Sequence, residues 1–177
     1  MKRLPDCGRG KRPETTGFSL LELVATVAIL ALLAGLVVPL VAGRVAATRD
    51  ARRAHDILLV RDAIEQFKLD TGEYPVGAPA SSWDTSEDGE FLKELVDGGY
   101  LADHVLDPLN DATHHFRYFR YARGQYGCVG PGQFYVLGIR AFESPGFDAL
   151  GASAFQCSGR DWGREFAYVT GGGARHD

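Results

Sequence analysis

Hydrophobic and polar residues divide the chain into three unlike segments. Residues 1–17 are almost devoid of apolar side chains, whereas residues 18–43 hold a single charged residue, Glu22. That apolar segment is 26 residues long, and about twenty apolar residues in a helix suffice to cross the hydrocarbon core of a bilayer. The remaining residues, 44–177, mix polar and apolar positions as a folded domain does. The pattern therefore predicts a membrane-spanning helix that leads into one polar domain.

The predicted helix continues beyond the apolar segment, but only one of its faces stays apolar. Apolar residues at spacings of three and four form one stripe: Ala54, Ile57, Val60, Ile64 and Phe67. The polar face is expected to carry the charged and amide side chains of this stretch: Arg52, Arg53, Asp56, Asp62, Glu65, Gln66 and Lys68. Gly72 suits a left-handed helix cap, and Pro75 prevents the helix from restarting. We therefore predict one long helix, from Phe18 to Thr71.

The segment after Pro75 carries the signals of a short helix and a small sheet. A cap at Thr85 or Ser86 predicts a short helix that ends at Gly98 and carries four apolar residues: Phe91, Leu92, Leu95 and Val96. Aromatic and β-branched residues between turns predict strands over residues 116–121, 133–139 and 165–169. The fold class is thus α+β, with a long N-terminal helix packed on a small antiparallel sheet. Its expected divisions are residues 1–17, 18–43, 44–72 and 73–177.

Composition and charge exclude several protein classes. The chain has 177 residues, of which 45% are hydrophobic and 24% charged, and this balance excludes a disordered or collagen-like protein. The net charge of −4 argues against a nucleic-acid-binding surface, which normally carries a basic excess. Residues 1–17 carry a net charge of +3, and residues 44–177 carry −6. The latter segment is long enough to bury one core.

The basic and apolar segments differ from a secretory signal peptide. The apolar stretch exceeds the usual length of roughly 7–15 residues, and no Ala-x-Ala cleavage site stands clear of it. A plain signal anchor is therefore one interpretation. Cations flank both ends of the span, so the positive-inside rule does not orient it. Cys128 and Cys157 form an even pair suited to an oxidising compartment, while Cys7 lies in the leader, so we expect the C-terminal domain outside the cytoplasm.

The junction between the basic and apolar segments reads Gly-Phe-Ser-Leu-Leu-Glu over residues 17–22. With the basic leader before it and the apolar run after it, the junction resembles the class III leader of type IV pilins and type II secretion pseudopilins. In that family a prepilin peptidase cuts after the glycine and methylates the new N-terminal residue. The resemblance implies cleavage between Gly17 and Phe18 and methylation of Phe18. It also implies that Glu22, a costly charge inside a span, pairs with the free amine of Phe18 on a neighbouring subunit.

The apolar segment also contains small residues and one proline. Ala25, Ala28, Ala31, Ala34 and Gly35 allow helices to approach closely in a membrane. Pro39 removes one N–H donor and crowds the carbonyl four residues earlier, which predicts a kink or a local opening of the helix. Flexibility at Pro39 suits assembly into a filament.

Two further stretches resemble major pseudopilins. Residues 69–75 read Leu-Asp-Thr-Gly-Glu-Tyr-Pro, similar to the end of the long helix in that family. Residues 105–110 read Val-Leu-Asp-Pro-Leu-Asn and resemble a second family segment, without its Trp-Gly pair and second proline. The resemblance implies a structural subunit of a periplasmic filament in a type II protein secretion system, and no enzyme activity. A type IV pilus subunit is one alternative, because the Cys128 and Cys157 pair also resembles the C-terminal region of many pilins. A membrane-anchored periplasmic binding domain is the other alternative, although the sequence shows no set of convergent polar groups for a pocket.

The resemblance further implies partners and a location. The partners would be other copies of the chain in a helical filament, prepilin peptidase, minor pseudopilins, an inner-membrane platform protein, an assembly ATPase and membrane lipid, with no nucleic acid. The chain would cross the bacterial inner membrane once, hold its C-terminal domain in the periplasm and then enter a periplasmic filament.

Two groups of residues could suggest a metal site or a catalytic site. Five residues within one short segment could suggest zinc, but their spacing matches no helical two-ligand signature: His104, Asp107, Asp111, His114 and His115. A solvated loop is the better interpretation. No nucleophile motif surrounds Cys128 or Cys157, so we predict a disulfide between them, which would stabilise the fold by roughly 3–4 kcal/mol.

Calcium is the remaining cofactor candidate. Major pseudopilins bind it in a C-terminal loop, and the ion needs six to eight oxygen ligands. The resemblance implies Glu143, Ser144 and Asp148 as candidate ligands, in a turn that reads Glu-Ser-Pro-Gly-Phe-Asp. A polar turn stabilised by the disulfide is the alternative. We expect no required cofactor, with calcium as the one candidate.

Overall fold

The computed structural model describes residues 17–151 and 154–174. Cys7 and the basic residues of the leader lie outside these ranges. The chain divides into two compact units, Met1–Val41 and Ala42–Asp177. The second unit, called the head below, contains the sheet and all the buried core residues.

One long helix, α1 (Leu20–Thr71), belongs to both units. It begins where the backbone N–H of Leu23 donates to the carbonyl of Ser19 (3.1 Å), two residues later than expected. It passes through Pro39 as one helix. Its end at Thr71 is as predicted, because Gly72 adopts a left-handed conformation (φ +84°) and donates its N–H to the carbonyl of Lys68.

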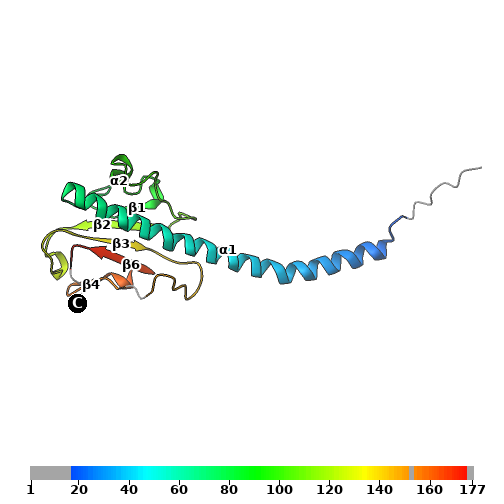
Figure 1. Ribbon diagram of the computed structural model, residues 1–177. Helices are drawn as coiled ribbons and strands as arrows, with labels where there is room; N and C mark the ends of the chain where they lie inside the picture. Colours follow the sequence, from blue (N-terminus) through cyan, green and yellow to red (C-terminus); the bar gives the residue numbers. More distant parts are fainter. Residues whose placement is uncertain (1–16, 152–153, 175–177) are drawn as a thin grey trace, which may run out of the picture. The chain divides into compact units, whose positions relative to one another are not determined.

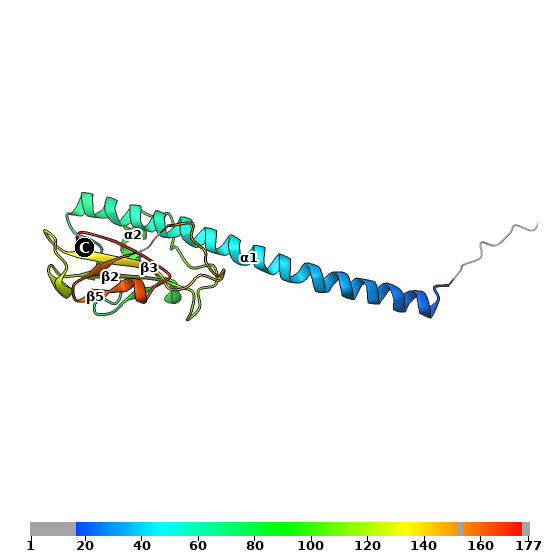
Figure 2. The ribbon, with the colours of Figure 1, turned by 90° about the horizontal axis from the view of Figure 1, so that it is seen from below.

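A four-stranded antiparallel sheet forms the centre of the head. In spatial order its strands are β1 (Asp84–Thr85), β2 (Phe116–Tyr121), β3 (Phe134–Ile139) and β6 (Tyr168–Gly172). A separate two-stranded ribbon pairs β4 (Gln156–Cys157) with β5 (Arg160–Asp161). Figures 1 and 2 show the part of α1 that belongs to the head running along the sheet. The α+β class with a long helix on a small antiparallel sheet is confirmed.

The two faces of the sheet bury different side chains because residues alternate along each strand. On one face, Tyr135, Leu137 and Ile139 of β3 pack in one cluster with Ile57 and Ile64 of α1. The apolar stripe predicted for the helix is therefore the surface that covers the sheet. On the other face, Phe134 and Val136 pack with the aromatic residues of the C-terminal segment, including Phe155, Trp162 and Phe166.

The predicted short helix begins later than expected, whereas its end before Gly98 is as predicted. Ser86–Asp88 forms a separate 3-10 turn, η1, which ends at Gly89 in a left-handed conformation. The α-helix, α2 (Lys93–Asp97), starts only after Leu92, whose φ is +48°. The break has a cause in the core, since the N–H of Leu92 donates to the buried carboxylate of Asp84 (3.2 Å).

The last strand is also displaced from the predicted range of residues 165–169. The carboxylate of Asp161 accepts from the N–H of Gly163 and caps a 3-10 turn, η3 (Trp162–Arg164), so the strand begins only at Tyr168. It continues through Gly171, where a Cβ atom would lie 2.3 Å from the carbonyl oxygen of Tyr135. A glycine in a sequence usually predicts a weakened strand. Here Gly171 allows the backbone of the last strand to approach the carbonyl of Tyr135 closely.

Candidate functional site

The junction at residues 17–22 is accessible. Phe18 is 82% exposed, and Gly17 and Glu22 are exposed as well. Glu22 lies in the first turn of α1, where the positive end of the helix dipole favours a carboxylate. The backbone around the bond between Gly17 and Phe18 and the carboxylate of Glu22 are therefore uncovered by the described part of the chain.

The helix that follows the junction exposes a continuous apolar surface. Among the described residues, one helix, α1, is long and apolar enough to cross a membrane. Its large apolar side chains in the first unit are exposed: Leu20, Leu21, Leu23, Val24, Val27, Ile29, Leu30, Leu32, Leu33, Leu36, Val37, Val38, Leu40 and Val41. A surface of this kind marks a contact with a membrane or with other proteins.

The head contains a buried cluster of charges that the sequence did not reveal. Arg53, expected on the polar face of the helix, is 0% exposed. Its guanidinium donates twice to Asp107, from Nε to Oδ2 (2.6 Å) and from Nη2 to Oδ1 (2.9 Å). Nη1 donates to Asp50 (2.7 Å) and to Glu143 (2.8 Å). We call Asp50, Arg53, Asp107 and Glu143 the charge cluster.

The pKa values reflect how tightly these charges are coupled. Burial alone would lower the pKa of Arg53, but the hydrogen bonds to Asp107 and Glu143 outweigh burial and raise it. Burial would likewise raise the pKa of Asp50, but N–H donors from Glu143 and Ser144 and the contact with Arg53 lower it. Hydrogen bonds from Arg49 and Arg53 lower the pKa of Glu143 to about 2. Arg53, Asp50 and Glu143 are therefore ionised at neutral pH.

The candidate calcium residues lie around this cluster. Glu143 binds Arg49 and Arg53 through its carboxylate, and the backbone N–H of Ser144 donates to Asp50 (2.8 Å). Asp148 is exposed. In the part of the chain that the structure describes, no group of three or more His, Cys, Asp or Glu side chains is arranged to hold a metal.

Two of the residues that could suggest zinc pair with each other, since Nδ1 of His114 lies 3.2 Å from Oδ1 of Asp111. The ring of His104 instead lies 3.3 Å from the carbonyl oxygen of Phe91. Asp107 belongs to the charge cluster, and its carboxylate also accepts from the N–H of Leu109 (2.9 Å). The ring of His115 lies 3.0 Å from the carbonyl oxygen of Asp111 through Nδ1. Asp107 therefore has a structural contact that explains its place in the segment resembling major pseudopilins.

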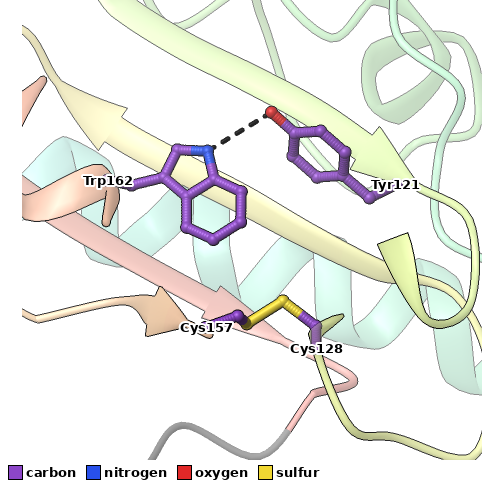
Figure 3. Close-up of a disulfide and its surroundings, with 4 residues drawn as sticks. All are labelled: Tyr121, Cys128, Cys157 and Trp162. Atoms are coloured by element: carbon purple, nitrogen blue, oxygen red, sulfur yellow. Dashed lines mark hydrogen bonds between the residues drawn. A yellow bond between two sulfur atoms is a disulfide. The ribbon is translucent and has the colours of Figure 1, made fainter. Parts of the chain in front are cut away.

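The expected disulfide joins Cys128 to Cys157, which are 29 residues apart, with 5.0 Å between their Cα atoms. Figure 3 shows it beside Tyr121 and Trp162, whose indole N–H donates to the Tyr121 hydroxyl (3.3 Å). Both cysteines are buried in the aromatic cluster on the outer face of the sheet. The disulfide thus fastens β4 to the segment that precedes β3.

Comparison with known proteins gives relatives of one kind. A protein of Pseudomonas aeruginosa named type II secretion system core protein G is 37% identical over 143 residues, which cover 75% of this chain and 89% of the relative. The protein of that name from Aeromonas hydrophila is 30% identical over 137 residues, covering 70% of this chain and 79% of the relative. This chain belongs to the core protein G family, the major pseudopilins of type II secretion. No protein-family model and no solved structure matches it.

Membership of the core protein G family bears on the choice between a secretion pseudopilin and a type IV pilus subunit. A third relative, from Vibrio cholerae, carries the same name and is 37% identical over 99 residues, 55% of this chain and 68% of the relative. The chain is a structural subunit of type II secretion, which favours that interpretation over a type IV pilus subunit. Core protein G relatives are structural pseudopilins rather than enzymes. An apolar N-terminal helix fits a membrane-anchored member of this family.

Proposed function

We propose that this pseudopilin is cut between Gly17 and Phe18, methylated at Phe18 and polymerised through residues 18–43 into a helical filament. In the filament the carboxylate of Glu22 pairs with the amine of Phe18 on an adjacent copy. The observation that carries the proposal is the exposed junction directly before an exposed apolar helix. Cleavage creates the amine, so assembly requires cleavage.

The length of the helix supports insertion of the uncut or newly cut subunit in a membrane. Residues 20–41 would span about 33 Å at 1.5 Å per residue, close to the roughly 30 Å of a bilayer core. Glu22 lies only four residues beyond Phe18, about 6 Å along the helix. It therefore stays near the lipid headgroups, where a charge costs less than at the centre of the span.

When the subunit leaves the lipid, the free-energy cost of the Glu22 charge depends on its new neighbours. Between packed helices a carboxylate without a partner is expensive, and a cation beside it removes that cost. The Phe18 amine of a neighbouring copy that is shifted by about 6 Å along the helix axis is a cation at the level of Glu22. We therefore assign Glu22 to the alignment of neighbouring subunits, and Pro39 to local adaptation of the helix within the filament.

The proposal includes a location and a set of partners. The subunit crosses the inner membrane once with its head in the periplasm, an oxidising compartment suited to the disulfide between Cys128 and Cys157. Prepilin peptidase cuts and methylates it. Minor pseudopilins, an inner-membrane platform protein and an assembly ATPase act with it, and ATP hydrolysis belongs to that ATPase.

The test compares Glu22→Gln with a matched charge removal in the head, Glu90→Gln, whose side chain is 66% exposed. Intact-mass analysis of membrane-extracted protein should show a chain that starts at methylated Phe18 in both variants. Glu22→Gln should lower the yield of sheared filaments and substrate export at least tenfold, because the intersubunit pair is lost. Glu90→Gln should leave both yields unchanged.

Two results would contradict the proposal. A mature mass that retains residues 1–17, in cells with active prepilin peptidase, would remove the processing step. Normal filament yield and normal export in Glu22→Gln would show that the carboxylate has no part in assembly, as a plain membrane anchor requires.

A further inference from the structure

The turn expected to bind calcium is held by arginine side chains in this chain. Glu143 accepts from Arg49 Nε (2.7 Å) and from Arg53 Nη1 (2.8 Å), and its second oxygen accepts from Arg49 Nη2. The neighbouring backbone is fixed as well, because the N–H groups of Glu143 and Ser144 donate to Asp50 (3.0 and 2.8 Å). A positive charge therefore already organises this turn.

We infer that Arg53 does in this head what a bound calcium ion would do, so that the turn at residues 143–148 is ordered without calcium. The charge cluster brings together carboxylates from three separate parts of the chain: α1, the segment before β2 and the segment after β3. A calcium ion gathers six to eight oxygen ligands, carboxylates among them, around one positive charge. Here the guanidinium of Arg53, 0% exposed, lies among them.

Each carboxylate oxygen of the charge cluster already accepts at least one N–H group. Both oxygens of Asp107 accept from Arg53, and one of them also accepts from the N–H of Leu109. Both oxygens of Asp50 and both of Glu143 accept from N–H groups in the same way. A calcium ion needs six to eight oxygens, so it would have to displace a buried guanidinium to reach these three carboxylates.

The other candidate ligands do not compensate. Asp148 is exposed, and Ser144 contributes its backbone N–H, a donor, to Asp50. A single exposed carboxylate does not make a site for a hard cation. The described residues of this turn therefore do not fit calcium, and they fit an internal arginine.

The test uses the full chain, extracted from membranes in detergent, with unfolding followed by tryptophan fluorescence. Trp162 is fully buried and reports on the head. The melting temperature is measured in excess EGTA and in millimolar calcium chloride. We expect the two melting temperatures to agree within about 1 °C. A ligand whose dissociation constant lies well below its concentration would instead stabilise the native state and raise the melting temperature by several degrees.

Glu143→Gln and Asp148→Asn form the matched pair of variants. We expect Glu143→Gln to lower the melting temperature by several degrees, equally in EGTA and in calcium, because Arg49 and Arg53 lose an ionised partner. Asp148→Asn should melt as the unmodified chain does. If Glu143→Gln fails to fold, Arg49→Met, a change at a partly exposed side chain, should lower the melting temperature in the same calcium-independent way.

Opposite results would overturn the inference. A calcium-dependent rise of more than about 1 °C in the unmodified chain, lost in either Glu143→Gln or Asp148→Asn, would show that the metal and not Arg53 orders the turn. An unchanged melting temperature in both Glu143→Gln and Arg49→Met would show that the arginine contacts do not support it.

Discussion

The two halves of α1 are equally helical but have opposite surroundings. In residues 20–41 the large apolar side chains are exposed, and Glu22 is the one charged residue. In residues 42–71 the apolar stripe is buried against the sheet, and the polar positions include the fully buried Arg53. Among the described residues, the large apolar side chains of the first half are thus uncovered, whereas the second half has partners for its apolar and charged side chains alike.

The contrast in exposure shows that the two halves of α1 are stabilised by different environments. A helix that is apolar on all sides needs lipid or other helices around it, whereas a helix with one apolar stripe needs a single covering surface. The sheet provides that surface for residues 42–71. Changes in the second half should therefore alter the stability of the head, and changes in the first half should alter assembly alone.

The largest effect is expected from Arg53→Met. Removing the guanidinium leaves Asp50, Asp107 and Glu143 without their shared cation, and breaking a buried ion pair from one side costs about 3–5 kcal/mol. Arg52→Met, one residue earlier, is the control, because the Arg52 side chain is 67% exposed and such a change costs at most about 0.5 kcal/mol. Urea unfolding of the two variants measures both values. Equal unfolding free energies for Arg53→Met and Arg52→Met would show that the buried arginine contributes no more to stability than the exposed one.

The next largest effect should come from the apolar residues. Ile57→Ala removes a fully buried side chain from the contact between α1 and the sheet, at a cost of about 2–4 kcal/mol in unfolding free energy. Leu30→Ala removes an exposed side chain from the first half and should leave the unfolding of the head unchanged. Loss of head stability in Leu30→Ala would mean that the two halves are not independent.

The smallest effect concerns Asp84, a buried carboxylate that, unlike those around Arg53, has no arginine beside it. Burial is the main cause that raises its pKa to about 6, and Asp88 and Glu94 raise it further, against the N–H groups of Ala78 and Leu92. The unfolded value is near 3.8. The folded state therefore binds the proton more tightly, and this group favours folding at low pH and ceases to do so as the pH rises through 6.

Asp84→Asn tests that contrast. The amide keeps an oxygen that can accept from Ala78 and Leu92 and removes the charge. Relative to the unmodified chain, the variant should gain about 1–2 kcal/mol of stability between pH 4 and pH 7. Urea unfolding at several pH values measures the gain, and Asp62→Asn, an exposed change, should show no such trend. A difference that stays constant with pH would show that Asp84 is ionised in the folded head without cost.

Much of this fold could be predicted because it depends on local patterns. The stripe from Ala54 to Ile64, the end of α1 at Gly72 and strand β2 all follow from residue spacing and turn chemistry. The disulfide followed from the even number of cysteines after the leader. These signals lie within short stretches of sequence, and tertiary packing reinforces them here.

The errors arise where distant residues decide the outcome. Arg53 has the sequence context of a surface residue, and only Asp107 and Glu143, 54 and 90 residues later, make its burial favourable. Asp84 likewise holds the N–H of Leu92 and delays the short helix. Gly171 belongs to a strand because the carbonyl of Tyr135 leaves no room for a side chain. No pattern in the local sequence contains these contacts.

The contact between Arg53 and Glu143 also bears on the order of events during synthesis of the chain. A ribosome makes residue 53 long before residue 143, and contacts between residues so far apart close late in folding. Until then Arg53 lacks its contact with Glu143, and the charge cluster is incomplete. The apolar half at the start of the chain is therefore synthesised, and ready to enter a bilayer, while the head is still incomplete. We expect a nascent chain stopped before residue 143 to be anchored already but sensitive to protease throughout its second unit.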